Sequence, residues 1–175
     1  MASFYELTIP VLTRALRTEV TLLKKAEEYA KSTGTSVEKL VAARLAPDMF
    51  SLSKQVGVTV HFARVASHLL AGRELVLTQL DEWSLEENYS AIADTLKLLA
   101  GIKPEDVDGK ESDVLSFNVG PGKDTSAKAV DYVTKFLMPS VYFHFITLYD
   151  ILRHEGVPLG KLDFLGHQIA EWELV

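Results

Sequence analysis

The 175-residue sequence contains no cysteine. This absence excludes disulfide bonds, thiolate catalysis and metal sites that depend on cysteine ligands. Long apolar runs are missing as well, and no stretch reaches the roughly 18 apolar residues that a membrane-spanning helix needs. The opening segment MASFYELTIP lacks the basic stretch and apolar core of a secretory signal. We therefore expect a cytoplasmic protein without membrane contact.

Clustered positive charge is also absent. The net charge is −6, and the basic residues are scattered along the chain. A nucleic-acid-binding protein needs a basic face, so we expect no nucleic-acid partner. Hydrophobic residues make up 47% and charged residues 24%, which is ordinary for a globular domain. The length suits one domain spanning residues 1–175.

The stretch that organises the chain runs from about residue 127 to residue 155. Its sequence, AKAVDYVTKFLMPSVYFHFITLYDILRHE, is apolar on nearly every side of a helix. Such a helix belongs in the middle of a bundle or at a subunit interface. Pro139 lies inside it and should bend it.

Three further stretches show helical periodicity. Each has apolar residues three or four positions apart and ends at a glycine, and they span about residues 8–33, 49–71 and 85–100. Ser84 and Glu87 have capping-box spacing before one of them, as have Thr35 and Glu38 before a short helix. Asp48 is expected to cap the second long helix.

Together these stretches predict an all-α four-helix bundle, in the simplest case with up-down-up-down topology. The segment 114–119 is strand-like and precedes the turn Gly120-Pro121-Gly122, so a short β-hairpin or lid is expected before the last long helix. The tail, residues 156–175, should pack on the bundle or on a partner.

Three segments together resemble a known family. They are YELTIPVL (5–12), VAARLAPDMFSLSKQV (41–56) and FLMPSVYFHFITLYDILRHEGVPLGKLDF (136–164). The sequence resembles an uncharacterised family of the DinB/YfiT-like superfamily, with the motifs ARLAPDMF and RHEGVPLGKLDFLG. The resemblance implies a four-helix bundle with a short β-like insertion before the last helix, and it implies no established activity.

The wider superfamily often binds a divalent metal ion through three histidines. One comes from the second helix, where His61 could match, and two form a His-x-x-x-His pair on a later helix, where His144 could match one member. The positions four residues from His144 hold Ser140 and Leu148. The pair is therefore absent, and we expect no metal and no cofactor.

His61 and His144 are the candidate functional residues. If the second and fourth long helices run in the same direction, both lie about 15 Å from the same end of the bundle. They could then share a polar pocket, with Tyr142 and Thr147 nearby. The alternative is that both are ordinary core or surface histidines.

Three functions are compatible with these residues. The first is binding of a small molecule in an apolar pocket, with histidine-assisted acid–base chemistry such as isomerisation or cyclisation. The second is a non-catalytic dimerisation or scaffold module, because the fourth helix and the tail offer apolar surface for a homodimer. The third is a divalent-metal-dependent enzyme of the DinB/YfiT-like type. The sequence leaves open whether the protein is an enzyme.

Overall fold

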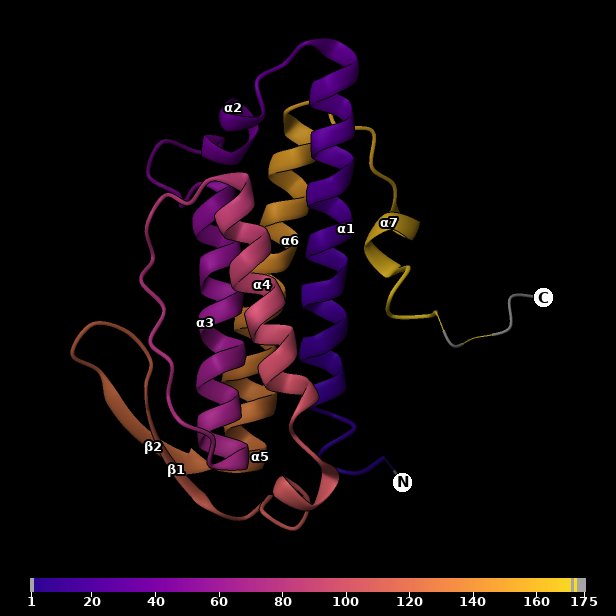
Figure 1. Cartoon of the computed structure of the whole chain (residues 1–175). Coiled ribbons are helices and arrows are strands. Elements are labelled where there is room, and N and C mark those ends of the chain that lie inside the picture. The colour runs from indigo at the N-terminus through magenta and orange to yellow at the C-terminus, as the bar shows by residue number, and fades with distance from the viewer. Residues whose placement is uncertain (1, 171, 173–175) are drawn as a thin grey trace.

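The computed structural model describes residues 2–170 and 172. Four long helices lie side by side as a bundle (Figure 1). They are α1 (Ile9–Thr33), α3 (Leu52–Ala71), α4 (Leu85–Ala100) and α6 (Met138–His154), with the short helix α2 (Val37–Ala42) and the turn η1 (Pro104–Asp106) in the connections. The expected helical bundle is therefore present. No helix of the described residues is long and apolar enough to cross a membrane.

The order of directions differs from the expected up-down-up-down. α3 and α4 run parallel, because the backbone N–H of Trp83 donates to Ser53 at one end of the pair and Arg64 donates to Thr95 further along. α6 runs antiparallel to α3, with His144 beside Gln55. The topology is up-down-down-up, so the sequence-based topology is wrong.

The connection of residues 73–83 causes this difference, because it returns along the length of α3 before α4 begins (Figure 1). Gly57 lets the connection approach α3 closely. A Cβ atom at this position would lie 3.1 Å from Leu80 Cδ2 and 3.6 Å from the ring of Trp83. A side chain at position 57 would therefore force the Leu80 side chain of the connection to shift.

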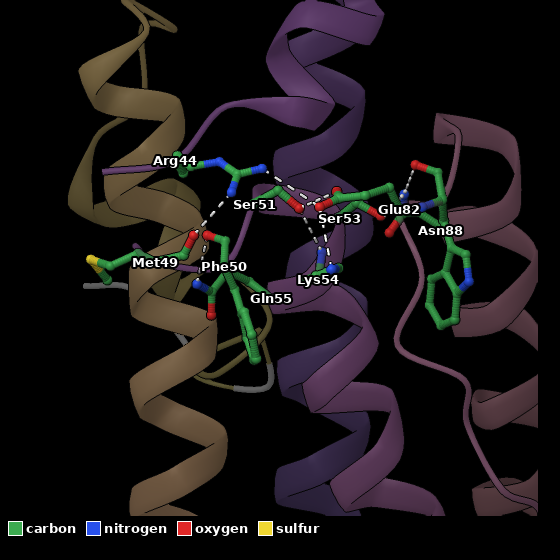
Figure 2. A network of polar contacts seen from close by, with 10 residues as sticks. Arg44, Met49, Phe50, Ser51, Ser53, Lys54, Gln55, Glu82 and Asn88 are labelled. Carbon is green, nitrogen blue, oxygen red and sulfur yellow. Dashed lines mark hydrogen bonds and ion pairs between the residues drawn. The ribbon is translucent and has the colours of Figure 1, made fainter. Parts of the chain in front are cut away.

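A polar network fixes the end of the connection that precedes α4 (Figure 2). Glu82 accepts a hydrogen bond from the hydroxyl of Ser51 and lies 3.5 Å from charged nitrogens of both Arg44 and Lys54. Asn88 donates to Ser53 in the same network. The ARLAPDMF segment and the start of α3 are thus tied to the start of α4.

The helix caps confirm one expectation and correct two. Ser84 and Glu87 form the predicted capping box of α4. α3, however, begins at Leu52 and is capped by Ser51 rather than by Asp48. α2 is capped by Ser36 rather than Thr35. In both cases the helix begins after the residue whose side chain accepts a hydrogen bond from the N3 backbone N–H. Several residues that could act as caps lie within a few positions of each start, so the sequence alone does not identify the one used.

The organising stretch is divided into three parts. α5 (Ala129–Tyr132) leads into a π-helical turn, η2 (Val133–Leu137), and then into α6. Pro139 lies just after η2. Proline has no N–H and its ring crowds the carbonyl four residues earlier, and a widened turn relieves that crowding. The bend expected at Pro139 takes the form of this π-turn.

α6 is buried on one side only. Phe145, Leu148 and Leu152 are fully buried, whereas Phe143 is 59% exposed and Ile146 is 44% exposed. The helix therefore has an apolar outer face in addition to its core face.

The expected hairpin is present as β1 (Val114–Asn118) and β2 (Asp124–Lys128), paired antiparallel with Ser116 opposite Ser126. In the tail, α7 (Lys161–Leu165) packs on α1, and Phe164 stacks on Phe145 with ring centroids 4.3 Å apart. The described part of the tail therefore packs on the bundle. Residues 171 and 173–175, at its end, lie outside the described residues.

Candidate functional site

A cavity of about 290 Å³ lies where the hairpin meets the C-terminal half of α3. Its walls come from four parts of the chain: α3, the connection, β1 and the α5–η2 segment. The lining residues are His61, Phe62, Val65, His68, Leu69, Leu75, Leu77, Ser116, Phe117, Asn118, Tyr132 and Phe136. The cavity therefore exists because the connection and the hairpin both lie against the same helix.

Four aromatic rings form one wall of this cavity. The ring of Phe117 on β1 lies 4.7 Å from that of Tyr132 and 5.4 Å from that of Phe136, centroid to centroid. Phe136 in turn meets Phe62 of α3 edge to face at 5.7 Å. These are favourable separations for aromatic pairs. The hairpin is thus held to the bundle by the same rings that line the cavity.

The π-turn η2 contributes to this arrangement. Tyr132 and Phe136 are four residues apart, and their ring centroids lie 6.1 Å apart beside the cavity. Val133 and Leu137, between and after them, are buried. Single π-turns inside helices occur frequently at functional sites. Here the widened turn coincides with the cavity wall.

Two fully buried polar atoms of cavity-lining residues have no hydrogen-bond partner among the described residues, the Nδ1 atom of His61 and the hydroxyl of Tyr132. Tyr132 is only 1% exposed. Burial raises the pKa of its phenol far above the usual range. Burial, and then the positive charge of Arg64, lower the pKa of His61. Both side chains are therefore uncharged at neutral pH.

The second nitrogen of His61 is the more accessible one. Nε2 has no hydrogen bond to a described residue, and, unlike Nδ1, it is not fully buried. It must therefore be open to solvent or to the cavity. His68 also lines the cavity, and its Nδ1 lies 2.7 Å from the carbonyl oxygen of Arg73.

His144 does not line the cavity. Its Nδ1 lies 2.6 Å from Oε1 of Gln55, and burial lowers its pKa to about 4. Its ring centroid is 6.3 Å from that of Phe62, which is also the neighbour of His61. The two imidazoles therefore flank one phenyl ring without sharing one cavity. The height argument from the sequence fails because α3 and α6 are antiparallel.

Tyr142 and Thr147 also lie away from the cavity. The hydroxyl of Thr147 donates to the carbonyl of Phe143 within α6. The ring of Tyr142 is half-buried and lies 6.4 Å from that of Phe145. Of the four residues expected at the site, only His61 lines it.

The comparisons with known proteins agree with the fold. The family model described as "Domain of unknown function (DUF1993)" matches residues 4–165. The chain belongs to this DUF1993 family. It is also similar to a DinB family member from Shewanella denitrificans of known crystal structure, with 29% identity and a TM-score of 0.81 over 93% of this chain and 91% of that one. No curated protein matches. The resemblance to an uncharacterised DinB-like family is therefore confirmed.

The donor set of this DUF1993 protein bears on metal binding. Among the described residues, no group of three or more His, Cys, Asp or Glu side chains is placed to hold a metal ion. Position 148, where the superfamily pattern would place the second histidine of the pair, is a fully buried leucine. The superfamily's three-histidine site therefore does not fit this chain.

Several residues of the site were not found from the sequence. The sequence places Tyr132 and Phe136 in an apolar helical stretch and Phe117 in a strand-like segment, and it indicates no role in a site for any of the three. The aromatic residue in the strand-like segment could have indicated the contact between the hairpin and the helices, because an amphipathic hairpin must pack its apolar face against other apolar side chains.

Proposed function

We propose that the protein binds a small uncharged molecule in the cavity between α3, the connection and the hairpin. The single observation that carries this is the lining itself, a largely aromatic and aliphatic wall whose polar members are uncharged types, among them His61, Ser116 and Asn118, with no Asp, Glu, Lys or Arg. An ionic ligand would lose its hydration there without gaining a charged partner. A neutral ligand would lose much less hydration free energy on entering the cavity.

The size of the cavity supports a small ligand. Its volume of about 290 Å³ is at the lower end of the roughly 300–1,000 Å³ typical of ligand pockets. A single six-membered ring with one or two substituents is the appropriate scale. Apolar rings would pack against Phe62, Phe117 and Phe136, and His61 would bind the polar group of the ligand.

We further propose that His61 acts on this ligand as an acid–base group, in a reaction such as an isomerisation or cyclisation. A neutral imidazole can take a proton from carbon or oxygen and return it elsewhere. The lowered pKa keeps His61 unprotonated at neutral pH. We place this activity in the cytoplasm.

Binding is tested with matched neutral and charged probes. Phenol and cyclohexanone should give saturable NMR shifts at residues that line the cavity, with Kd values on the order of 1 mM or below. Benzoate and benzylammonium, of similar size, should not. Val65→Trp, in the cavity wall on α3, should block binding by filling the cavity, whereas Ser90→Trp, on the exposed face of α4, should not. Equal binding of all four probes, or shifts elsewhere, would contradict the proposal.

The acid–base role has a separate readout. Cyclohexanone in D₂O exchanges hydrogen for deuterium next to its carbonyl when a base removes the proton. The wild-type protein should accelerate this exchange, and His61→Leu should lose most of the acceleration while still binding the ketone. If the exchange rate is the same for both proteins, the acid–base proposal fails and the binding proposal stands.

A second proposal concerns assembly, and the outer face of α6 favours it. Phe143 and Ile146 are exposed side by side on this face, and a second copy of the chain would cover them. Sedimentation equilibrium should show a homodimer at micromolar concentration. Phe143→Glu should give the 19.4 kDa monomer, and Leu162→Glu, on exposed α7, should leave the dimer intact. A wild-type monomer at all concentrations would disprove this.

A further inference from the structure

Gln55 has an amide whose orientation is fixed by its neighbours. It lies in the first turn of α3, and only 1% of it is exposed. Its Nε2 donates to the carbonyl oxygen of Phe50 at 3.2 Å (Figure 2). The reverse orientation would place two oxygens against each other at this distance. Oε1 must therefore be the atom that points to His144.

This orientation determines where His144 carries its proton. Nδ1 of His144 lies 2.6 Å from Oε1 of Gln55, and an amide oxygen can only accept a hydrogen bond. Nδ1 is therefore the protonated nitrogen of the neutral ring. Nε2 then keeps a free lone pair, which is the opposite of the tautomer that an unconstrained neutral histidine prefers.

The lone pair on Nε2 remains available. The ring of His144 is half-buried, and Nε2 has no partner among the described residues, yet it is not fully buried. Its surroundings are apolar, with the rings of Phe143 and Phe62 at 5.1 and 6.3 Å. Desolvation alone lowers the pKa of His144, without a contribution from any charged side chain of α3 or α6. The nearest charged neighbour of Gln55 along α3, Lys54, is paired with Glu82.

We infer that Gln55 is a positioning residue that holds His144 in the Nδ1–H tautomer, so that Nε2 serves as a proton acceptor for a neutral hydroxyl or amide group. This supplies a second base beside Phe62, outside the set of residues that line the cavity. Because His144 does not line the cavity of the proposed function, the inference goes beyond that function and does not rest on it. The tautomer itself requires no ligand, so the two can fail separately.

The test is long-range ¹H–¹⁵N NMR of the histidine rings, which distinguishes the two neutral tautomers by their nitrogen shifts. In the wild type at pH 7, His144 should show a protonated Nδ1 and an unprotonated Nε2. Gln55→Leu should shift His144 to the Nε2–H tautomer. Gln79→Leu, at an exposed position of the connection, should change nothing.

A second variant gives a pH readout. Gln55→Glu places a carboxylate at the same distance from Nδ1 and should stabilise the imidazolium, so the titration of His144 should move up by more than one pH unit. If the contact between Gln55 and His144 were purely structural, both variants would be less stable than the wild type and the titration of His144 would not move up. A wild-type His144 with its proton on Nε2, or a tautomer unchanged in Gln55→Leu, would overturn the inference. The wild-type spectrum decides even if a variant fails to fold.

Discussion

Replacing Phe145 by alanine is expected to lower the free energy of unfolding by about 3–5 kcal/mol. Phe145 is fully buried and is stacked on Phe164 of α7, so its loss would leave a cavity between α6 and the tail. Phe143 lies two residues earlier on the same helix but is 59% exposed. Phe143→Ala should therefore change stability by no more than about 0.5 kcal/mol when measured on the monomer.

Denaturant unfolding of the two variants beside the wild type measures this difference. The pair is a matched control, because both substitutions remove the same side chain from the same helix. If Phe143→Ala lowers the free energy of unfolding as much as Phe145→Ala does, then the face of α6 that packs on the core is not the one that contains Phe145. In that case the outer face proposed for self-association would also be assigned wrongly.

Glu19 should make the stability of the protein fall as the pH rises. This side chain of α1 is fully buried, and one carboxyl oxygen, Oε1, has no partner among the described residues. The other, Oε2, lies 2.9 Å from Oγ1 of Thr59, which also lies 2.8 Å from the carbonyl oxygen of Val56. The threonine hydroxyl has one hydrogen and cannot donate to both oxygens.

A protonated Glu19 allows both contacts of the Thr59 hydroxyl to form, while Oε1 stays without a partner. Its carboxyl O–H donates to Thr59, and Thr59 donates to the carbonyl of Val56. Burial also raises the pKa of Glu19 well above its ordinary value, in spite of the hydrogen bond with Thr59. Folding therefore takes up a proton at this residue, and its stabilising contribution is complete below about pH 4.5, where the carboxyl is protonated even in the unfolded chain. The contribution is lost as the pH rises through the raised pKa.

The variant Glu19→Gln should remove this pH dependence. Compared at pH 9, the Gln protein should be more stable than the wild type by an amount on the order of 1–3 kcal/mol, the general cost of a buried polar group that lacks its hydrogen bond. The difference should shrink or reverse at pH 5. Measurements above pH 7 avoid the opposite effect of His61 and His144, whose lowered pKa values cost stability only as the pH falls below about 6.5. Parallel pH profiles of the two proteins would show that Glu19 is ionised in the fold.

The helices could be predicted from the sequence because apolar spacing and glycine positions record local structure. The direction of each helix could not be predicted, since an amphipathic stripe has the same spacing whether the neighbouring helix is parallel or antiparallel. A signal was nevertheless present in the connection of residues 73–83. Eleven extended residues reach about 36 Å, which exceeds the roughly 30 Å of a 20-residue helix such as α3. The connection was therefore long enough to return along α3.

The site was predicted less well than the fold, for a physical reason. His61 was singled out by its match to the first histidine of the superfamily pattern and by its expected height beside His144, although the height argument is wrong. Tyr132, Phe117 and Gln55 have roles that arise only from contacts between distant segments. Glu19 could have been found, because it stands seven residues from both Leu12 and Ala26 in the buried stripe of α1. A carboxyl at such a position has to be neutral or paired.

A crystal structure of the protein soaked in phenol tests the central claim most directly, because it shows both where the ligand lies and what it touches. We expect the phenol ring between Phe62, Phe117 and Phe136, with its hydroxyl within hydrogen-bond distance of Nε2 of His61. A soak of benzoate at the same concentration should leave this cavity without a bound ring. Phenol bound only elsewhere, or a cavity that remains without phenol at saturating concentration, would contradict the account.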